Sequence, residues 1–334
     1  MARLKGFRVD DVSHSGRSSI KALVTDYLGM TAALLLLIVI FGLTAENFLT
    51  WTNFATIANQ VPDTTIAAVG MTFVLVIAGI DLSVGSIAAL AGAVLGIALV
   101  DWELPLGLAI PVCLGVGLLC GVANGVITVG WRLPSFIVTL GMLEAARGGA
   151  YLVTQSRTIY VGDPIEVVTT RLLPALSVPF VFALLVVAIG QLVLSRTVFG
   201  RYLVAIGTNE EAVRLSGIDP RPYKVAVFVL SGLLAAAAAV IQTARMSSAN
   251  PNTAIGFELQ VIAAVVIGGT SLMGGRGSVI RSFFGVLIIA VLGAGLAQVG
   301  AQESTKRLIT GSVIVAAVIL DQYRHRIHRT PRPR

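Results

Sequence analysis

The sequence predicts an all-α polytopic membrane protein with about ten transmembrane helices. Hydrophobic residues make up 56% of the 334 residues, charged residues make up only 12%, and the mean hydropathy is +0.89. Soluble domains carry about 25% charged residues, so this chain has too few to cover a water-soluble particle. In lipid, long apolar segments must be helical because a helix satisfies its own backbone hydrogen bonds.

A helix needs about 20 apolar residues to cross the hydrocarbon core of a bilayer. Apolar segments of this kind recur along the whole chain, and glycine-rich breaks blur the bounds of the second, third, eighth and ninth. The predicted spans are residues 28–45, 62–79, 84–100, 106–129, 135–154, 173–194, 223–244, 258–273, 278–298 and 305–321.

Both termini are predicted to be cytoplasmic. An even number of spans places them on one side, and this orientation puts 18 of the 24 Lys and Arg residues inside, as the positive-inside rule requires. The first span follows a long basic segment without an A-x-A cleavage pattern, so we interpret it as uncleaved. The chain then divides into a cytoplasmic tail (1–27), a transmembrane domain (28–321) and a basic cytoplasmic tail (322–334).

Two glycine-containing patterns predict how the spans pack and where they break. Gly117, Gly121 and Gly125 lie four residues apart, a spacing that lets helices approach closely. The segment 76–86 resembles the segment 266–278. Internal repeats with interrupted helices are typical of transporters.

The cytoplasmic loop 195–222 contains a predicted short helix. Asn209 is a suitable N-cap, Glu210 and Glu211 suit the positive end of the helix dipole, and Gly217 is a natural stop. This helix is either a linker lying at the membrane interface or a docking element for another protein. Its polar residues are Glu210, Glu211 and Arg214, and its predicted apolar anchors are Ala212, Val213 and Leu215.

Few charged residues lie within the spans. Glu144 and Arg147 are three residues apart and therefore share a helical face. They are expected either to neutralise each other or to line a polar passage. Asn124 is a further polar candidate for the passage or the bundle interior, and Asp81 is expected to cap the third span.

The sequence contains no catalytic or metal-binding constellation. All three histidines lie in the tails, and the glycine-rich segment 268–277 lacks the lysine that a phosphate-binding loop requires. A carrier driven by an ion gradient needs acidic groups near the midplane, and Glu144 is the one good candidate. The sequence therefore indicates a transport passage that depends on a partner protein for its energy source.

Three motifs resemble the ribose-type permeases of ABC importers. They are Gly79-Ile-Asp-Leu-Ser-Val-Gly-Ser86, which holds Asp81, Ser83 and Gly85; the residues from Gly200 to Ile218; and those from Glu258 to Gly277. The resemblance extends from about Phe48 to Asp321.

This resemblance implies a ten-span fold like that of the cobalamin importer (type II) in a bacterial inner membrane. It implies a second permease copy or paralogue, two ATPase subunits or one fused double ATPase, a substrate-binding protein, surrounding lipid and no nucleic acid. ATP and Mg²⁺ would bind the ATPase, so no cofactor is expected on this chain, which is not an enzyme. The residues that would contact the ATPase are Asn209, Glu210, Glu211, Arg214, Leu215, Ser216, Gly217 and Ile218.

The implied solute is a monosaccharide or a similar small polyhydroxylated molecule. A nucleoside permease of the same kind is the alternative. An ion-coupled secondary carrier is less favoured because the spans offer so few acidic groups.

Overall fold

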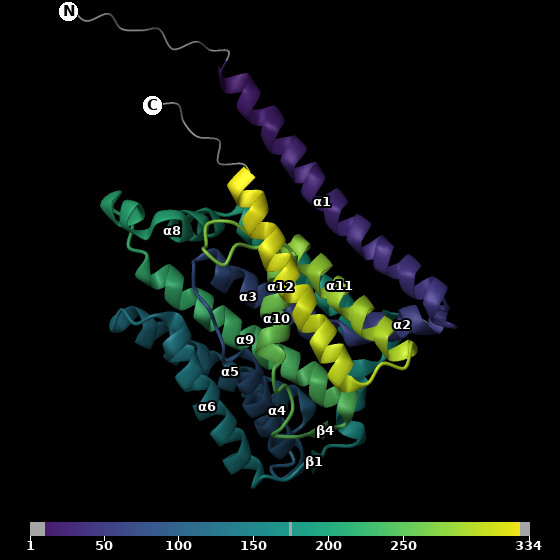
Figure 1. Cartoon of the computed structure of the whole chain (residues 1–334). Coiled ribbons are helices and arrows are strands. Elements are labelled where there is room, and N and C mark those ends of the chain that lie inside the picture. Colours follow the sequence, from purple (N-terminus) through teal and green to yellow (C-terminus); the bar gives the residue numbers. More distant parts are fainter. Residues whose placement is uncertain (1–10, 174–175, 328–334) are drawn as a thin grey trace, which may run out of the picture.

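The computed structural model describes residues 11–173 and 176–327, which form a helical bundle (Figure 1). The α-helices are α1 (Asp11–Thr44), α2 (Trp51–Gln60), α3 (Pro62–Val76), α4 (Val84–Val100), α5 (Leu106–Gly130), α6 (Ser135–Thr154), α7 (Val178–Arg196), α8 (Val198–Leu215), α9 (Arg221–Met246), α10 (Phe257–Ile267), α11 (Val279–Gln298) and α12 (Glu303–Ile327). A 3₁₀ helix, η1 (Asp163–Thr169), lies between α6 and α7.

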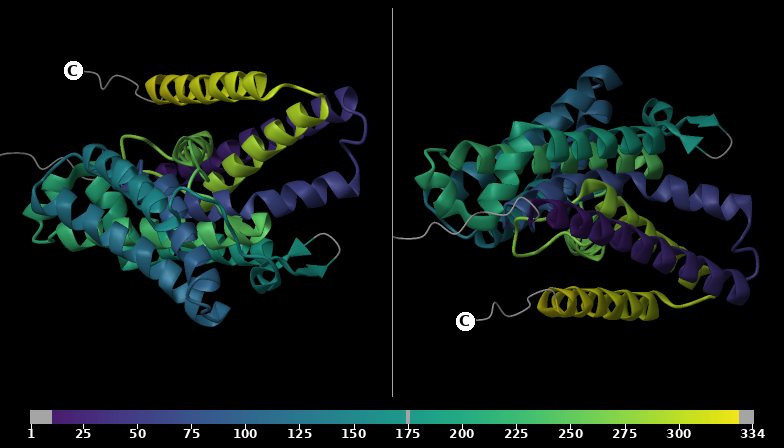
Figure 2. Two further views of the ribbon diagram at one scale, coloured as in Figure 1. Left: turned by 90° about the horizontal axis from the view of Figure 1, so that it is seen from below. Right: turned by 90° about the horizontal axis from the view of Figure 1, so that it is seen from above.

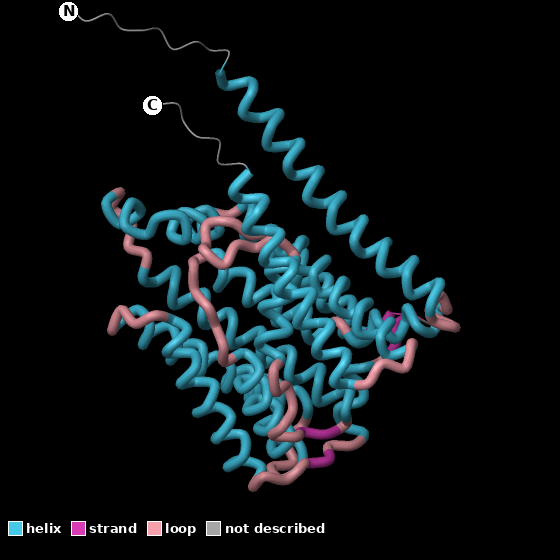
Figure 3. The backbone as a smooth tube through the Cα atoms, in the orientation of Figure 1, coloured by secondary structure: helices cyan, strands magenta, loops and turns pink. Residues whose placement is uncertain are grey.

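Four short strands connect the helices at their ends. The strand β1 (Ile159–Tyr160) pairs antiparallel with β4 (Ser248–Ala249) and so joins the connections that follow α6 and α9. The strands β2 (Arg171–Leu173) and β3 (Leu176–Ser177) form a separate antiparallel hairpin. Figure 3 shows both pairs in magenta at the margins of an otherwise helical molecule.

The fold confirms an all-α polytopic membrane protein. Six helices of the described chain are long and apolar enough to cross a membrane: the Tyr27–Thr44 part of α1, together with α5, α6, α7, α9 and α11. Each of the ten predicted ranges contains a helix, but α3, α4 and α10 are shorter than a full span. The number of spans therefore stays a prediction.

Two predicted bounds were wrong for local reasons. The span expected from residue 173 begins at Val178, because residues before it form the β2–β3 hairpin. The span expected to end at residue 273 stops at Ile267, because Gly268 and Gly269 follow and Gly269 takes a positive φ of 79°. The helix α2 lies outside all ten predicted ranges.

The helix α9 lies at the centre of the bundle and packs against α3, α4 and α5. Its contact with α5 confirms the packing predicted from the glycines four residues apart. A Cβ atom added at Gly121 would lie 2.8 Å from the Val229 Cα atom, and one at Gly125 would lie 2.9 Å from the Val225 Cα atom. Only glycine allows the two backbones to approach this closely.

The two ends of the bundle differ. The helix α8, the first turns of α1 and the last turns of α12 lie at one end, whereas β1 and β4 lie at the other (Figure 1). Figure 2 shows α12 outside the main bundle, and its helix contacts are with α10 and α11. We refer to the end that holds α8 as the α8 end.

Candidate functional site

The helix α8 consists of two helical parts joined at Asn209. The backbone of Asn209 is not helical (φ −161°, ψ 95°), and its side-chain Oδ1 accepts the Ala212 N–H at 3.0 Å. Gly217 ends the second part with a φ of 87°. The structure thus confirms the predicted short helix, its N-cap and its stop.

The first part of α8, from Val198 to Thr208, was expected to be a loop. Its glycines and its arginine gave a weak hydropathy signal. A local signal was available, however, because Thr197 Oγ1 accepts the Gly200 N–H at 3.1 Å, which is the spacing of an N-cap.

The second part of α8 projects a mixed surface. Glu210 pairs with Lys224 of α9 at 3.0 Å, and Glu211 pairs with Arg214 at 2.7 Å. Leu215 is 79% exposed and stands beside these charged groups. Val213 is buried in this chain, so the prediction of Val213 as a free anchor was wrong.

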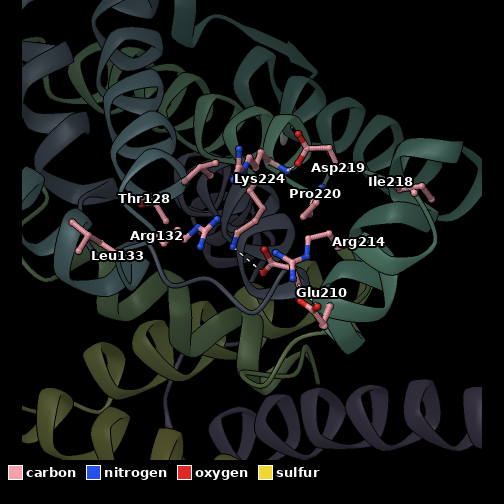
Figure 4. A pocket seen from close by; sticks show the side chains of 13 residues that line it. Thr128, Arg132, Leu133, Glu210, Arg214, Ile218, Asp219, Pro220 and Lys224 are labelled. Atoms are coloured by element: carbon pink, nitrogen blue, oxygen red, sulfur yellow. Dashed lines mark hydrogen bonds and ion pairs between the residues drawn. The ribbon is translucent and has the colours of Figure 1, made fainter.

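A cavity of about 740 Å³ lies beside this surface, between α8, the start of α9 and the turn from α5 to α6 (Figure 4). Its walls carry both charge signs and several apolar groups. They comprise Thr128, Val129, Arg132, Leu133, Glu210, Glu211, Arg214, Gly217, Ile218, Asp219, Pro220, Arg221 and Lys224.

The segment between α3 and α4 is a non-helical break, so its backbone groups need hydrogen-bond partners from other parts of the chain. Two hydroxyl groups of α6 satisfy it. The Ile80 N–H donates to Ser135 Oγ at 2.9 Å, and the Leu82 N–H donates to Thr139 Oγ1 at 3.1 Å. Thr139 Oγ1 also donates to the Ile80 carbonyl at 3.2 Å. Side chains of α6 therefore replace the missing helical hydrogen bonds.

Asp81 ties this break to two further helices. Its fully buried carboxylate accepts the Ser83 N–H at 3.0 Å, the Ser83 hydroxyl at 2.6 Å and the Ser231 hydroxyl of α9 at 2.8 Å. Asn124 of α5 donates to Ser83 Oγ at 2.9 Å. Asn124 is itself fully buried, which places it at this junction in the bundle interior.

The prediction that Asp81 caps the third span was wrong. The N-cap position of α4 belongs to Ser83, whose side chain makes no capping hydrogen bond. Instead, Asp81 Oδ1 accepts the Ser83 N–H two residues later in the chain, and Asp81 Oδ2 accepts the Ser231 hydroxyl of α9. Gly85 also packs tightly, because a Cβ atom there would collide with Glu258 Oε2 and lie 2.5 Å from the Ala254 carbonyl oxygen.

The second break, between α10 and α11, is held by α7. Gln191 Oε1 accepts the Ser278 hydroxyl at 3.1 Å and the Ile280 N–H at 3.2 Å. Ser282 accepts a hydrogen bond from Thr72 of α3 at 2.8 Å. The two segments with similar sequences are therefore both helix breaks, and each recruits polar groups from neighbouring helices.

The two breaks and α8 meet at one point. The Gly275 N–H, in the second break, donates to the Val76 carbonyl at the end of α3 at 2.9 Å. A Cβ atom added at Gly207 of α8 would collide with that carbonyl oxygen and lie 2.6 Å from Gly275 N. A displacement of α8 would thus press directly on both breaks.

Glu144 and Arg147 do not form the predicted pair. Arg147 Nη1 donates to the carbonyls of Pro251 at 2.6 Å and Thr253 at 2.8 Å. Glu144 is exposed, and the ion pairs within the described residues do not include it. The Arg147 side chain instead reaches two carbonyls of the loop that follows β4.

The chain matches a known protein family over most of its length. Residues 53–318 match the family described as "Branched-chain amino acid transport system / permease component". The match includes α8, both breaks and the buried Asp81 junction.

Individual relatives match at similar extent. The ribose import permease protein RbsC of Haemophilus influenzae is 41% identical over 296 residues, which cover 87% of this chain and 91% of that protein. The ribose import permease protein RbsC of Escherichia coli strain K12 is 38% identical, with 86% and 91% covered. The fructose import permease protein FrcC of Rhizobium meliloti is 34% identical, with 87% and 83% covered. No solved structure matches the chain.

Proposed function

The chain belongs to the family of branched-chain amino acid transport system permease components, and we propose that it is the membrane-spanning subunit of an ABC importer for a monosaccharide. The names of the matched relatives, which import ribose or fructose, support a sugar over a nucleoside. In this proposal, a substrate-binding protein delivers the solute, a second permease subunit completes the passage, and partner ATPase subunits bind ATP and Mg²⁺.

The observation that carries the coupling role is the geometry of α8. Its second part is a capped helix that presents Leu215 outward, while its first part touches both helix breaks through Gly207. A protein bound to Leu215 could therefore act on the breaks through the Asn209 joint and the first part of α8. We assign Asn209, Glu210, Glu211, Arg214, Leu215, Ser216, Gly217 and Ile218 to the ATPase contact.

The Leu215→Asp variant tests this assignment in the reconstituted importer. A buried apolar anchor replaced by a charge costs an interface about 2 kcal/mol or more, so we expect ATPase binding and solute-stimulated ATP hydrolysis to be lost. Ile255→Asp is a matched control, because Ile255 is 65% exposed in the loop after β4. The coupling role is refuted if Leu215→Asp keeps both the bound ATPase and its solute response.

The architecture that we propose is the ten-span type II importer fold, placed in a bacterial inner membrane with both termini cytoplasmic. The helices found in all ten predicted ranges support it, as does the position of the first turns of α1 and the last turns of α12 at the α8 end. Cysteines introduced at Ser13 and Thr330 should resist labelling from outside intact cells. Labelling at either position would contradict the proposed orientation.

Glu144 is our candidate for the polar passage. A charged group within a membrane helix usually faces the bundle interior or a water-filled cavity, and Glu144 is exposed in the single subunit. In the proposed importer the second permease subunit would cover this face of α6.

Uptake of ribose and fructose by the wild-type complex, with a nucleoside as the comparison, tests the solute class independently of the coupling variants.

A further inference from the structure

Arg132 occupies a backbone position that favours glycine. It follows the last turn of α5 with a φ of 54°, and the Leu133 N–H donates to the Thr128 carbonyl at 3.1 Å. This arrangement is a Schellman-type helix end, where glycine adopts the left-handed conformation without steric cost. An arginine at this position is strained, and such strain is often found at functional sites.

The guanidinium of Arg132 has no ionic partner among the described residues. It points into the cavity beside α8 (Figure 4). Of the other cationic side chains in the cavity, two form ion pairs with glutamates and one does not. Lys224 pairs with Glu210, and Arg214 pairs with Glu211. Arg221 also lines the cavity and forms no ion pair within the described chain. Two unpaired arginines therefore face one cavity.

The cavity shares its wall with the surface assigned to the ATPase contact. Glu210, Glu211 and Arg214 belong to both, and Leu215 follows directly in sequence. Gly217 and Ile218 also belong to both. A protein that binds these shared residues would therefore cover part of the cavity wall. Unpaired charges at such an edge steer and orient a partner of opposite charge.

We propose that this cavity receives an acidic segment of the ATPase subunit, whose carboxylate binds Arg132 and Arg221. This inference rests on the proposed function and adds a second contact to the α8 surface. A phospholipid phosphate is the competing occupant. The three acidic residues on the walls, Glu210, Glu211 and Asp219, disfavour a ligand that carries negative charge alone. A protein surface can carry both acidic and basic side chains and so pair with both kinds of residue on the cavity walls.

The test uses three substitutions of Arg132 in the full-length permease, with the affinity for the purified ATPase as the readout. Arg132→Glu should weaken binding at least tenfold at physiological salt, and Arg132→Lys should weaken it less. Arg132→Gly should weaken binding severalfold while the thermal stability of the permease is unchanged or higher, because glycine removes the backbone strain. Arg157→Glu, at the opposite end of the molecule, is the charge-matched control and should bind like the wild type.

Salt dependence supplies a second readout. The wild-type affinity should fall as ionic strength rises, and Arg132→Gly should flatten that dependence because one charge pair is missing. If Arg132 has a purely structural role at the end of α5, Arg132→Gly will instead lower the stability of the isolated permease and leave the salt dependence of binding unchanged. That result would overturn the proposal.

The outcomes separate this inference from the coupling role of α8. If Leu215→Asp abolishes ATPase binding while Arg132→Glu binds like the wild type, the acidic contact is refuted and the coupling role stands. If neither variant affects binding, both fail. If Arg132→Glu spares ATPase binding but lowers the anionic phospholipid that copurifies with the permease, the cavity is a lipid site and the proposal is overturned.

Discussion

The two helix breaks have similar sequences but different surroundings. The first, between α3 and α4, is enclosed by α5, α6 and α9 and holds the buried Asp81 carboxylate. The second, between α10 and α11, reaches the surface, where Met273 is 85% exposed. Sequence similarity therefore specifies that the helix stops, whereas the neighbouring helices decide whether the stop is a rigid junction or an accessible loop.

The largest effect on stability is expected at the enclosed break. Asp81→Ala removes the acceptor of three hydrogen bonds and leaves the buried Ser83 N–H without a partner. Because hydrogen bonds to charged groups are worth about 1.5–3 kcal/mol, we expect a loss of about 3 kcal/mol. Thermal unfolding of the purified permease measures it. Ser231→Ala removes one of these donors and should cost about 1 kcal/mol. Equal effects of the two variants would contradict the central role of the carboxylate.

Gly207→Ala tests the point where the breaks meet α8. Alanine in place of glycine within a helix normally stabilises by about 1 kcal/mol, but here the new Cβ collides with the Val76 carbonyl. We expect a net loss of about 1–3 kcal/mol and uncoupling of ATP hydrolysis from uptake. Gly148→Ala is the control, because no atom lies within 4 Å of the added Cβ. If ATP hydrolysis and uptake stay coupled in Gly207→Ala, the proposed transmission from α8 to the breaks is contradicted.

A smaller effect is expected where α7 supports the second break. Gln191→Ala leaves the Ser278 hydroxyl and the Ile280 N–H without their acceptor. Both hydrogen bonds go to a neutral amide oxygen, so we expect a loss of about 1 kcal/mol in thermal unfolding. Gln298→Ala, at the exposed end of α11, should stay within about 0.5 kcal/mol of the wild type. A loss as large as that of Asp81→Ala would mean that the two breaks are equally rigid.

The smallest effect is expected at the tip of the second break. Met273→Ser replaces a side chain that is 85% exposed, so its stability should stay within about 0.5 kcal/mol of the wild type. The matched change in the first break is Leu82→Ser, because the Leu82 N–H itself donates a hydrogen bond to Thr139 Oγ1. The comparison between the breaks would be wrong if Met273→Ser were the more damaging of the two.

The sequence predicts features that depend on neighbouring residues. The Asn209 cap, the Gly217 stop and the close-packed glycines of α5 all follow from spacings of three or four residues, which fix local geometry. The helical ranges are predictable for the same reason, since hydropathy is a local property.

Contacts between distant segments could not be predicted in this way. Arg147 binds carbonyls more than 100 residues away rather than Glu144 three residues away. Asp81 reaches Ser231 of α9, and Val213 is covered by the body of the bundle. In each case local spacing gave a reasonable partner, and the tertiary packing offered a better one.

The exposed carboxylate of Glu144 has a consequence for the life of the subunit before assembly. A charged residue at the centre of a membrane helix costs about 2.5–3.5 kcal/mol during membrane insertion, and Glu144 has no ion pair among the described residues that would offset this cost. In an unassembled subunit, membrane quality-control proteases could therefore recognise the exposed Glu144 carboxylate. Assembly of the importer would cover it. Produced without its partners, the wild-type chain should have a shorter half-life in cells than Glu144→Ala, and coexpression of the complete importer should remove the difference.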